Sequence, residues 1–196
     1  MCGTIRTRGS GPSLSEMHNA RVGSPLSRFA RGALAGATGA ALWAWQQPLD
    51  KRVFACAYDD VELLGKLIAA EGGWARAGWA LHLANGSGFG VAYVALEARL
   101  PGPAWFRGLL AAQIENFGGW PLVRLVDRFH PARAELVPLT GNRRALAQAT
   151  WRHAIFGVVV GALVGTSGHW RPQLPPRSAI DSRATMSREE LPSSIR

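Results

Sequence analysis

The segment from Ala77 to Leu96, AGWALHLANGSGFGVAYVAL, has twenty residues and no formal charge when His82 is neutral. An α-helix of that length spans roughly 30 Å, which is the thickness of the hydrocarbon core of a bilayer. The segment nevertheless contains His82, Asn85 and Ser87, and burying such groups in lipid without partners is costly. We therefore predict a membrane-spanning helix whose polar side faces other helices.

Three further segments are apolar over a similar length, and together they predict the fold class. Hydrophobic residues make up 47% of the 196-residue chain and charged residues 18%, against roughly 25% charged in average soluble proteins. Polar residues concentrate at the two ends. We predict an all-α polytopic membrane protein, with a four-helix transmembrane bundle in residues 25–166 and disordered tails at 1–24 and 167–196. The expected spans cover about 28–46, 74–96, 104–126 and 145–165.

Prolines and a capping residue refine these boundaries. Pro48 is expected to end the first span, and Pro121 is expected to kink the third span near Phe117. Between the first two spans, the pattern predicts a short amphipathic helix over residues 59–71, capped by Asp59 or Asp60. That helix fits either a membrane surface or an ordinary solvated loop.

Small residues recur at intervals of four in the predicted spans. Such stripes allow helix backbones to approach closely, and they favour a homo-oligomer or another membrane protein as a partner besides the lipid bilayer. The predicted packing glycines are Gly32, Gly36, Gly86, Gly157, Gly161 and Gly165.

Polar residues of three spans are expected at one depth. Counted from the helix ends at 1.5 Å per residue, His82, Glu115 and His153 lie about equally far from the same face of the bundle. One interpretation is structural, with Glu115 paired to Arg152 or to His153. The other is a functional site for a proton, a small solute or a lipid headgroup. The candidate layer consists of His82, Asn85, Glu115, Asn116, Arg152 and His153.

Cofactor, nucleic-acid and catalytic motifs give little support to other classes. Two histidines at matched depth could ligate a haem through His82 and His153, but nothing else in the sequence favours haem, and no cofactor is expected. The sequence has no HExxH, P-loop or GxSxG motif, so neither a metal site nor an enzyme is predicted. The net charge of +9 is scattered over tails and loops without a basic stripe, so no nucleic-acid partner is expected.

Four groups of residues resemble the YagU-like small inner-membrane proteins of bacteria. They are RGALAGATGAALWAW, LHLANGSGFGVAYVAL with His82, the Trp120-Pro121 segment, and WRHAIFGVVVGAL with His153. The resemblance covers about residues 28–166 and implies a four-helix integral membrane protein without assigned biochemistry.

The sequence therefore predicts a multi-pass protein of the cell membrane. Basic residues are slightly more numerous in the tails and the short loop than in the two longer loops, which places both termini in the cytoplasm. The expected function is a structural or regulatory component of the bacterial envelope. The alternative is a small protein that translocates protons or a solute through the buried His/Glu layer.

Overall fold

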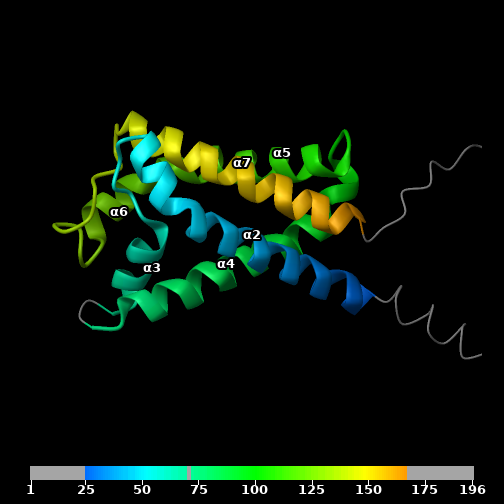
Figure 1. The fold of residues 1–196 in the computed structure, drawn as a ribbon, viewed down its shortest axis with the longest axis horizontal. Helices are drawn as coiled ribbons and strands as arrows, with labels where there is room; N and C mark the ends of the chain where they lie inside the picture. Colours follow the sequence, from blue (N-terminus) through cyan, green and yellow to red (C-terminus); the bar gives the residue numbers. More distant parts are fainter. Residues whose placement is uncertain (1–24, 70–71, 167–196) are drawn as a thin grey trace, which may run out of the picture.

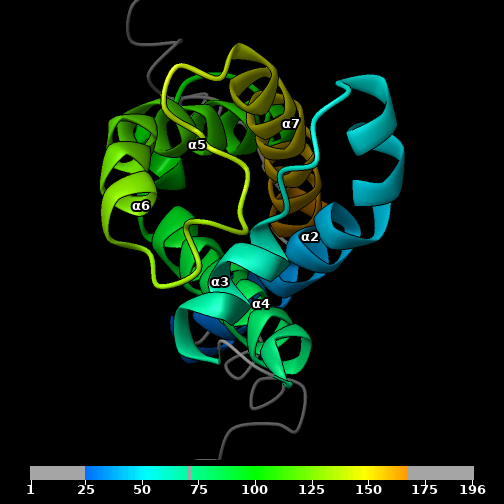
Figure 2. The same ribbon diagram turned by 90° about the vertical axis from the view of Figure 1, so that its left-hand side faces the viewer.

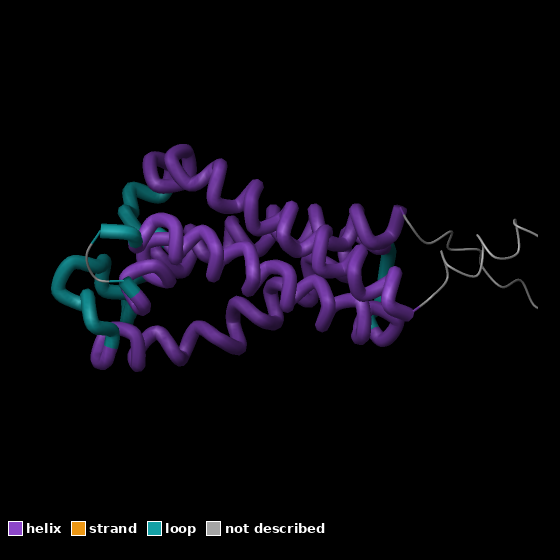
Figure 3. Tube along the Cα trace, turned by 90° about the horizontal axis from the view of Figure 1, so that it is seen from below, coloured by secondary structure: helices purple, strands orange, loops and turns teal. Residues whose placement is uncertain are grey.

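The computed structural model describes residues 25–69 and 72–166, and this part of the chain consists of helices and connecting loops (Figure 3). The all-α prediction is confirmed. The long helices are α2 (Pro25–Val53), α4 (Trp74–Leu96), α5 (Ala104–Gly119) and α7 (Arg143–Thr166). Shorter elements are α3 (Asp60–Ile68), α6 (Val123–Phe129), and the 3-10 turns η1 (Glu97–Arg99) and η2 (Trp120–Leu122). The predicted tails lie outside the described residues.

The helix α2 occupies the centre of the arrangement. It packs against α4 on one side and α7 on the other, while α5 pairs with α7 and α3 packs on α4 (Figure 1). In the view along the bundle, α2 and α7 lie between α4 and α5 and connect them through their contacts (Figure 2). The four long helices therefore follow the order α4, α2, α7, α5 around the bundle.

Glycines let the paired helices approach closely. A Cβ atom at Gly36 would overlap the carbonyl oxygen of Gly86, and one at Gly90 would overlap that of Gly32. The second pair of helices has an equivalent contact, where a Cβ at Gly108 would overlap the carbonyl oxygen of Gly157. Each seam is thus a backbone-to-backbone contact that a larger residue would disturb. Gly161 packs against the Ala104 carbonyl in the same way, and Gly165 packs against the Cβ atom of Ala104.

Apolar side chains divide between a small core and the outer surface. The largest buried cluster contains alanines, valines and aromatic rings: Ala35, Ala40, Trp43, Tyr93, Val94, Ala112, Phe156 and Val160. Many of the large apolar side chains that raise the hydropathy of the sequence face outwards instead, among them Leu34, Trp45, Leu49, Ile114, Phe117 and Trp151.

Two predictions about prolines have different outcomes. The prediction that Pro48 ends the first helix is wrong, because α2 continues through Pro48 to Val53. Asp50, two residues after Pro48, accepts buried hydrogen bonds from α7. These bonds stabilise the last turns of α2, although Pro48 has no backbone N–H to donate. Pro121 does interrupt the third segment, which ends at Gly119 and resumes as α6 after the turn η2. The short helix α3 forms with Asp59 as its cap, since the Asp59 carboxylate accepts the backbone N–H of Glu62 at 3.0 Å.

The prediction of four membrane spans must be corrected. Among residues 25–69 and 72–166, no helix is both long enough and apolar enough to cross a bilayer. The reason is the polar side chains in the middle of the long helices, such as His82 in α4, Glu115 in α5 and Arg152 in α7. The multi-pass membrane location with cytoplasmic termini is overturned by the same finding.

Candidate functional site

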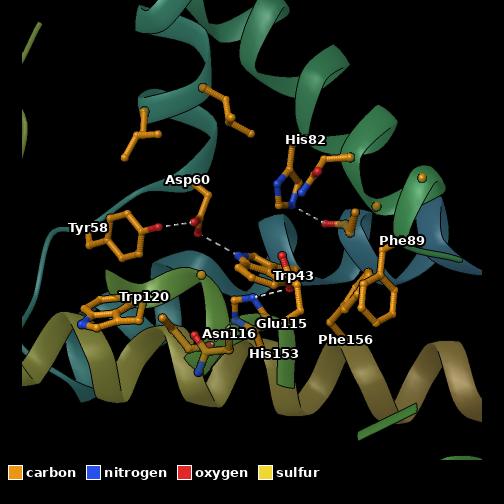
Figure 4. A pocket seen from close by; sticks show the side chains of 18 of the residues that line it. Trp43, Tyr58, Asp60, His82, Phe89, Glu115, Asn116, Trp120, His153 and Phe156 are labelled. Atoms are coloured by element: carbon orange, nitrogen blue, oxygen red, sulfur yellow. Dashed lines mark hydrogen bonds and ion pairs between the residues drawn. The ribbon is translucent and has the colours of Figure 1, made fainter. Parts of the chain in front are cut away.

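A cleft of about 510 Å³ lies between α4 and α5, and residues of α2 and α7 also line it. All four long helices, together with α3, α6 and the turn η2, contribute to its walls, so the cleft depends on the whole bundle. Aromatic rings alternate there with a few polar groups (Figure 4). Its main side chains are Trp43, Tyr58, Asp60, Leu63, Leu64, His82, Asn85, Phe89, Glu115, Asn116, Trp120, His153 and Phe156.

Trp43 of α2 contacts cleft residues of both α4 and α7. Its ring makes edge contacts with the imidazoles of His82 and His153, with ring centroids 5.5 Å and 4.5 Å away, and a third with Phe156 at 5.9 Å. Its indole Nε1 donates a 2.9 Å hydrogen bond to Asp60 Oδ2. Figure 4 shows the indole between the two histidines. A buried tryptophan whose N–H is satisfied in this way is a rigid part of the wall.

Glu115 and His153 form an ion pair at the cleft, with 3.0 Å between Glu115 Oε2 and His153 Nε2. The other ring nitrogen, Nδ1, lies 2.7 Å from the carbonyl oxygen of Ala149, which can only accept a hydrogen bond. Nδ1 is therefore the donor in this hydrogen bond, and Nε2 faces the carboxylate. The side chain of Glu115 is 51% exposed, and among the described residues its second oxygen has no hydrogen-bond partner. This pair is one of the two that the sequence suggested.

His82 of α4 is buried and lies within hydrogen-bonding distance of the backbone of α2. Its Nε2 is 3.1 Å from the carbonyl oxygen of Ala40, so Nε2 is the donor. Burial lowers the pKa of His82 below its usual 6.5, against an opposing effect of the Asp60 charge. The neutral ring therefore leaves Nδ1 as an acceptor, and within the described part of the chain Nδ1 has no partner.

Asp60 forms the polar wall at the α3 end of the cleft. Its carboxylate accepts hydrogen bonds from Trp43 Nε1, from the Tyr58 hydroxyl at 2.5 Å and from Arg152 Nη1 at 2.6 Å. Burial and the neighbouring Asp60 raise the pKa of Tyr58 well above its usual 10, so the phenol stays protonated and donates. Asp60 is consequently well satisfied, in contrast to Glu115.

Arg152 does not belong to the cleft lining, although the sequence placed it in the same layer as His153. Its guanidinium is fully buried and bonds Asp50 through Nε at 2.6 Å and Nη2 at 2.7 Å, and Asp60 through Nη1. Burial disfavours the charged guanidinium, but the hydrogen bonds of Asp50 and the charge of Asp60 outweigh burial and raise the pKa of Arg152. The suggested Glu115–Arg152 pair does not form. Gln46 and Gln148 each donate a further 2.6 Å bond to Asp50.

The two asparagines of the predicted layer have different roles. Asn85 is exposed at the cleft. Asn116 is buried, and its side-chain nitrogen donates to the Thr150 hydroxyl at 3.2 Å, which ties α5 to α7. Five residues of the layer therefore line the cleft (His82, Asn85, Glu115, Asn116 and His153), with Asn116 also joining α5 to α7, whereas Arg152 lies outside the lining.

The two histidines that could ligate a haem already make contacts within the protein. Both nitrogens of His153 already have partners, Nε2 of His82 faces the Ala40 carbonyl, and the Trp43 ring lies against both imidazoles. In the described residues, no three side chains of the His, Cys, Asp and Glu types gather in a way that could hold a metal ion.

Comparisons with known proteins do not add a family. The chain matches no protein-family model, no curated protein and no solved structure. The resemblance to YagU-like proteins stays a prediction. What the cleft does must therefore be inferred from its own residues.

Sequence reasoning missed the acidic partners of Arg152. Asp50 was assigned to a loop because Pro48 was expected to end the helix, and Asp60 was considered only as a cap. The three aspartates at positions 50, 59 and 60 close to a predicted helix end were the available signal. Trp43 is not among the residues that the sequence marks as site candidates, whereas it is 7% exposed and lies at the centre of the cleft wall.

Proposed function

We propose that this protein binds a small organic molecule with an aromatic or other apolar body in the cleft between α4 and α5. The observation that carries the proposal is an open cavity of about 510 Å³ with walls of Trp43, Phe89, Trp120 and Phe156. Ligand sites in proteins typically have volumes of about 300–1,000 Å³, mostly apolar walls and a few fixed polar groups. The cleft has each of these properties.

The polar groups at the cleft favour binding over nucleophilic catalysis. Among the described residues that line it there is no serine, threonine or cysteine that the His153 imidazole could activate. His82 and Glu115 instead each present an acceptor that no other described residue pairs with. Such groups orient a ligand and give the site its specificity.

The sequence-based alternative was a protein that translocates a proton or a solute through the His/Glu layer. The proposed function keeps a site for a solute but includes no translocation. The purely structural interpretation explains Arg152 and Asn116, whose hydrogen bonds join helices. It does not explain why Glu115 faces an open cavity with one oxygen unpaired. A binding role accounts for both sets of residues.

Filling the cleft tests the proposal. Gly88 lines the cleft, and a Cβ built there meets no atom within 4 Å, so Gly88→Leu should place its side chain in open space. Gly118 of α5 is equally open but lies outside the cleft, which makes Gly118→Leu the matched control. Both changes should favour the helix, because glycine costs about 0.5–1 kcal/mol there.

The measurement is a fluorescence titration with N-phenylnaphthylamine, a neutral aromatic probe. We expect saturable one-to-one binding by the native chain and by Gly118→Leu, and binding at least about tenfold weaker by Gly88→Leu. Absence of saturable binding, or equal affinity in the two leucine variants, would contradict the proposal.

A further inference from the structure

From the charges and hydrogen-bonding groups of the cleft, we infer that its ligand is an organic cation, a protonated amine on an apolar or aromatic body, with Glu115 as the recognising carboxylate. This inference rests on the proposed function and specifies the class of ligand. It is carried by three independent properties of the cleft.

The first property is the sign of the charge at the cleft. The whole chain carries a net charge of +9, yet the described residues that line the cleft include two carboxylates, Asp60 and Glu115, and no lysine or arginine. Arg152, the guanidinium behind this wall, is already shared by Asp50 and Asp60. Three carboxylates (Asp50, Asp60 and Glu115) with one guanidinium keep a net negative charge even when His153 is protonated, so the wall favours a cation and disfavours an anion.

The second property is a surplus of acceptors. His82 donates from Nε2 to Ala40 and so offers Nδ1 as an acceptor. Glu115 uses one oxygen for His153 and offers the other. Two donors of the cleft are already used, because Trp43 and Tyr58 both donate to Asp60. A ligand that complements these two acceptors supplies N–H donors, as an ammonium group does.

The third property is the aromatic wall. Trp43 and Phe156 lie edge to face with centroids 5.9 Å apart, and Phe89 packs on Phe156 at 4.9 Å. Aromatic faces attract cations, most strongly where water is excluded. The same rings bury the apolar body of the ligand. Aromatic walls and a carboxylate with a spare oxygen thus match the two ends of an apolar amine.

Three ligands with the same aromatic body test the inference by isothermal titration calorimetry. They are naphthylmethylammonium, the neutral naphthylmethanol and the anionic naphthoate. We expect the ammonium to bind at least about tenfold more tightly than the alcohol, as charge-assisted hydrogen bonds usually do, and naphthoate to bind most weakly.

Glu115→Gln isolates the recognising group. Glu115 is half-exposed, so the variant should fold, and it should bind the ammonium and the alcohol with about equal affinity. The matched control is Glu97→Gln, because Glu97 lies in η1 and does not line the cleft. This control should keep the full preference for the ammonium.

The outcomes separate the inference from the function on which it rests. If the native chain binds the alcohol or naphthoate as tightly as the ammonium, or if Glu115→Gln keeps the preference, the inference is wrong and the cleft remains a binding site. If none of the three ligands binds, the proposed function fails, and the inference fails with it.

Discussion

Arg152 and His153 are neighbours in the sequence, but they belong to opposite kinds of environment. The guanidinium of Arg152 is fully buried and shared by two aspartates, whereas the imidazole of His153 faces a cleft and pairs with a half-exposed glutamate. Successive residues of a helix are separated by about 100° around its axis, so one helix can serve both environments. Arg152 is thus a polar group that holds the helices together, whereas His153 is one that remains accessible to a ligand.

The glycines also divide into those buried in a helix contact and those that border the open cleft. Gly36 and Gly86 lie in the closed seam between α2 and α4, where each backbone touches the other. Gly88, only two residues after Gly86, borders the cleft and has open space above it. The closed and open sides of α4 are therefore separated by less than one helical turn.

The largest effect should come from removing the buried cation. Arg152→Ala leaves the carboxylates of Asp50 and Asp60 without their shared partner in the interior, so the free energy of unfolding should fall by about 3–5 kcal/mol. Urea denaturation measures this loss. The control is Arg107→Ala on α5, whose partly exposed side chain donates to the Gly102 carbonyl and should change stability by less than about 1 kcal/mol. Similar losses in the two variants would remove the distinction between the buried cluster and the surface.

A methyl group added at the seam should have an intermediate effect. Gly36→Ala places a Cβ against the carbonyl of Gly86, so α2 and α4 must move apart, at a cost of about 1–3 kcal/mol. Gly88→Ala, on the open side, should instead stabilise the helix by about 0.5–1 kcal/mol. Thermal unfolding of both variants checks the opposite signs, and a destabilised Gly88→Ala would show that the cleft is not open at that position.

The stability should also depend on pH through His82. Because burial lowers its pKa in the native state, the unfolded chain binds the proton more readily than the folded chain. The stabilisation is complete above the unfolded value of about 6.5 and is lost as the pH falls through the lower native pKa. His82→Gln keeps a donor for the Ala40 carbonyl but cannot titrate, so it should lose less stability than the native chain between about pH 7.5 and 5.5. Equal losses in urea titrations would exclude His82 as the cause.

The smallest effect on stability should come from the accessible carboxylate. Glu115→Gln weakens one partly exposed ion pair, and such pairs contribute about 0–1 kcal/mol. Differential scanning calorimetry should therefore give nearly the native midpoint, even though the affinity for an ammonium ligand falls. A loss as large as that of Arg152→Ala would mean that Glu115 is part of the structural cluster.

The pattern of apolar and small residues was enough to predict the helices and to name part of the glycines at the seams, such as Gly36 and Gly86, but not Gly90 or Gly108. Helical periodicity indicates which residues share a face, but it does not determine which of two adjacent polar residues faces which neighbour. For this reason the sequence alone groups Arg152 with His153 and does not pair it with Asp50. The membrane assignment failed for a related reason, because the length of the apolar segments was given more weight than the polar side chains within them.

The central claim is that the cleft beside Trp43 binds a ligand, and the imidazole resonances of the histidines test it most directly. His82 and His153 line the cleft, whereas His130 is buried elsewhere, with Nε2 3.0 Å from the Leu63 carbonyl. On titration with naphthylmethylammonium, heteronuclear NMR should show saturable shifts of the His82 and His153 side chains and none of His130. Shifts confined to other parts of the molecule, with the two cleft histidines unchanged at saturation, would contradict the account.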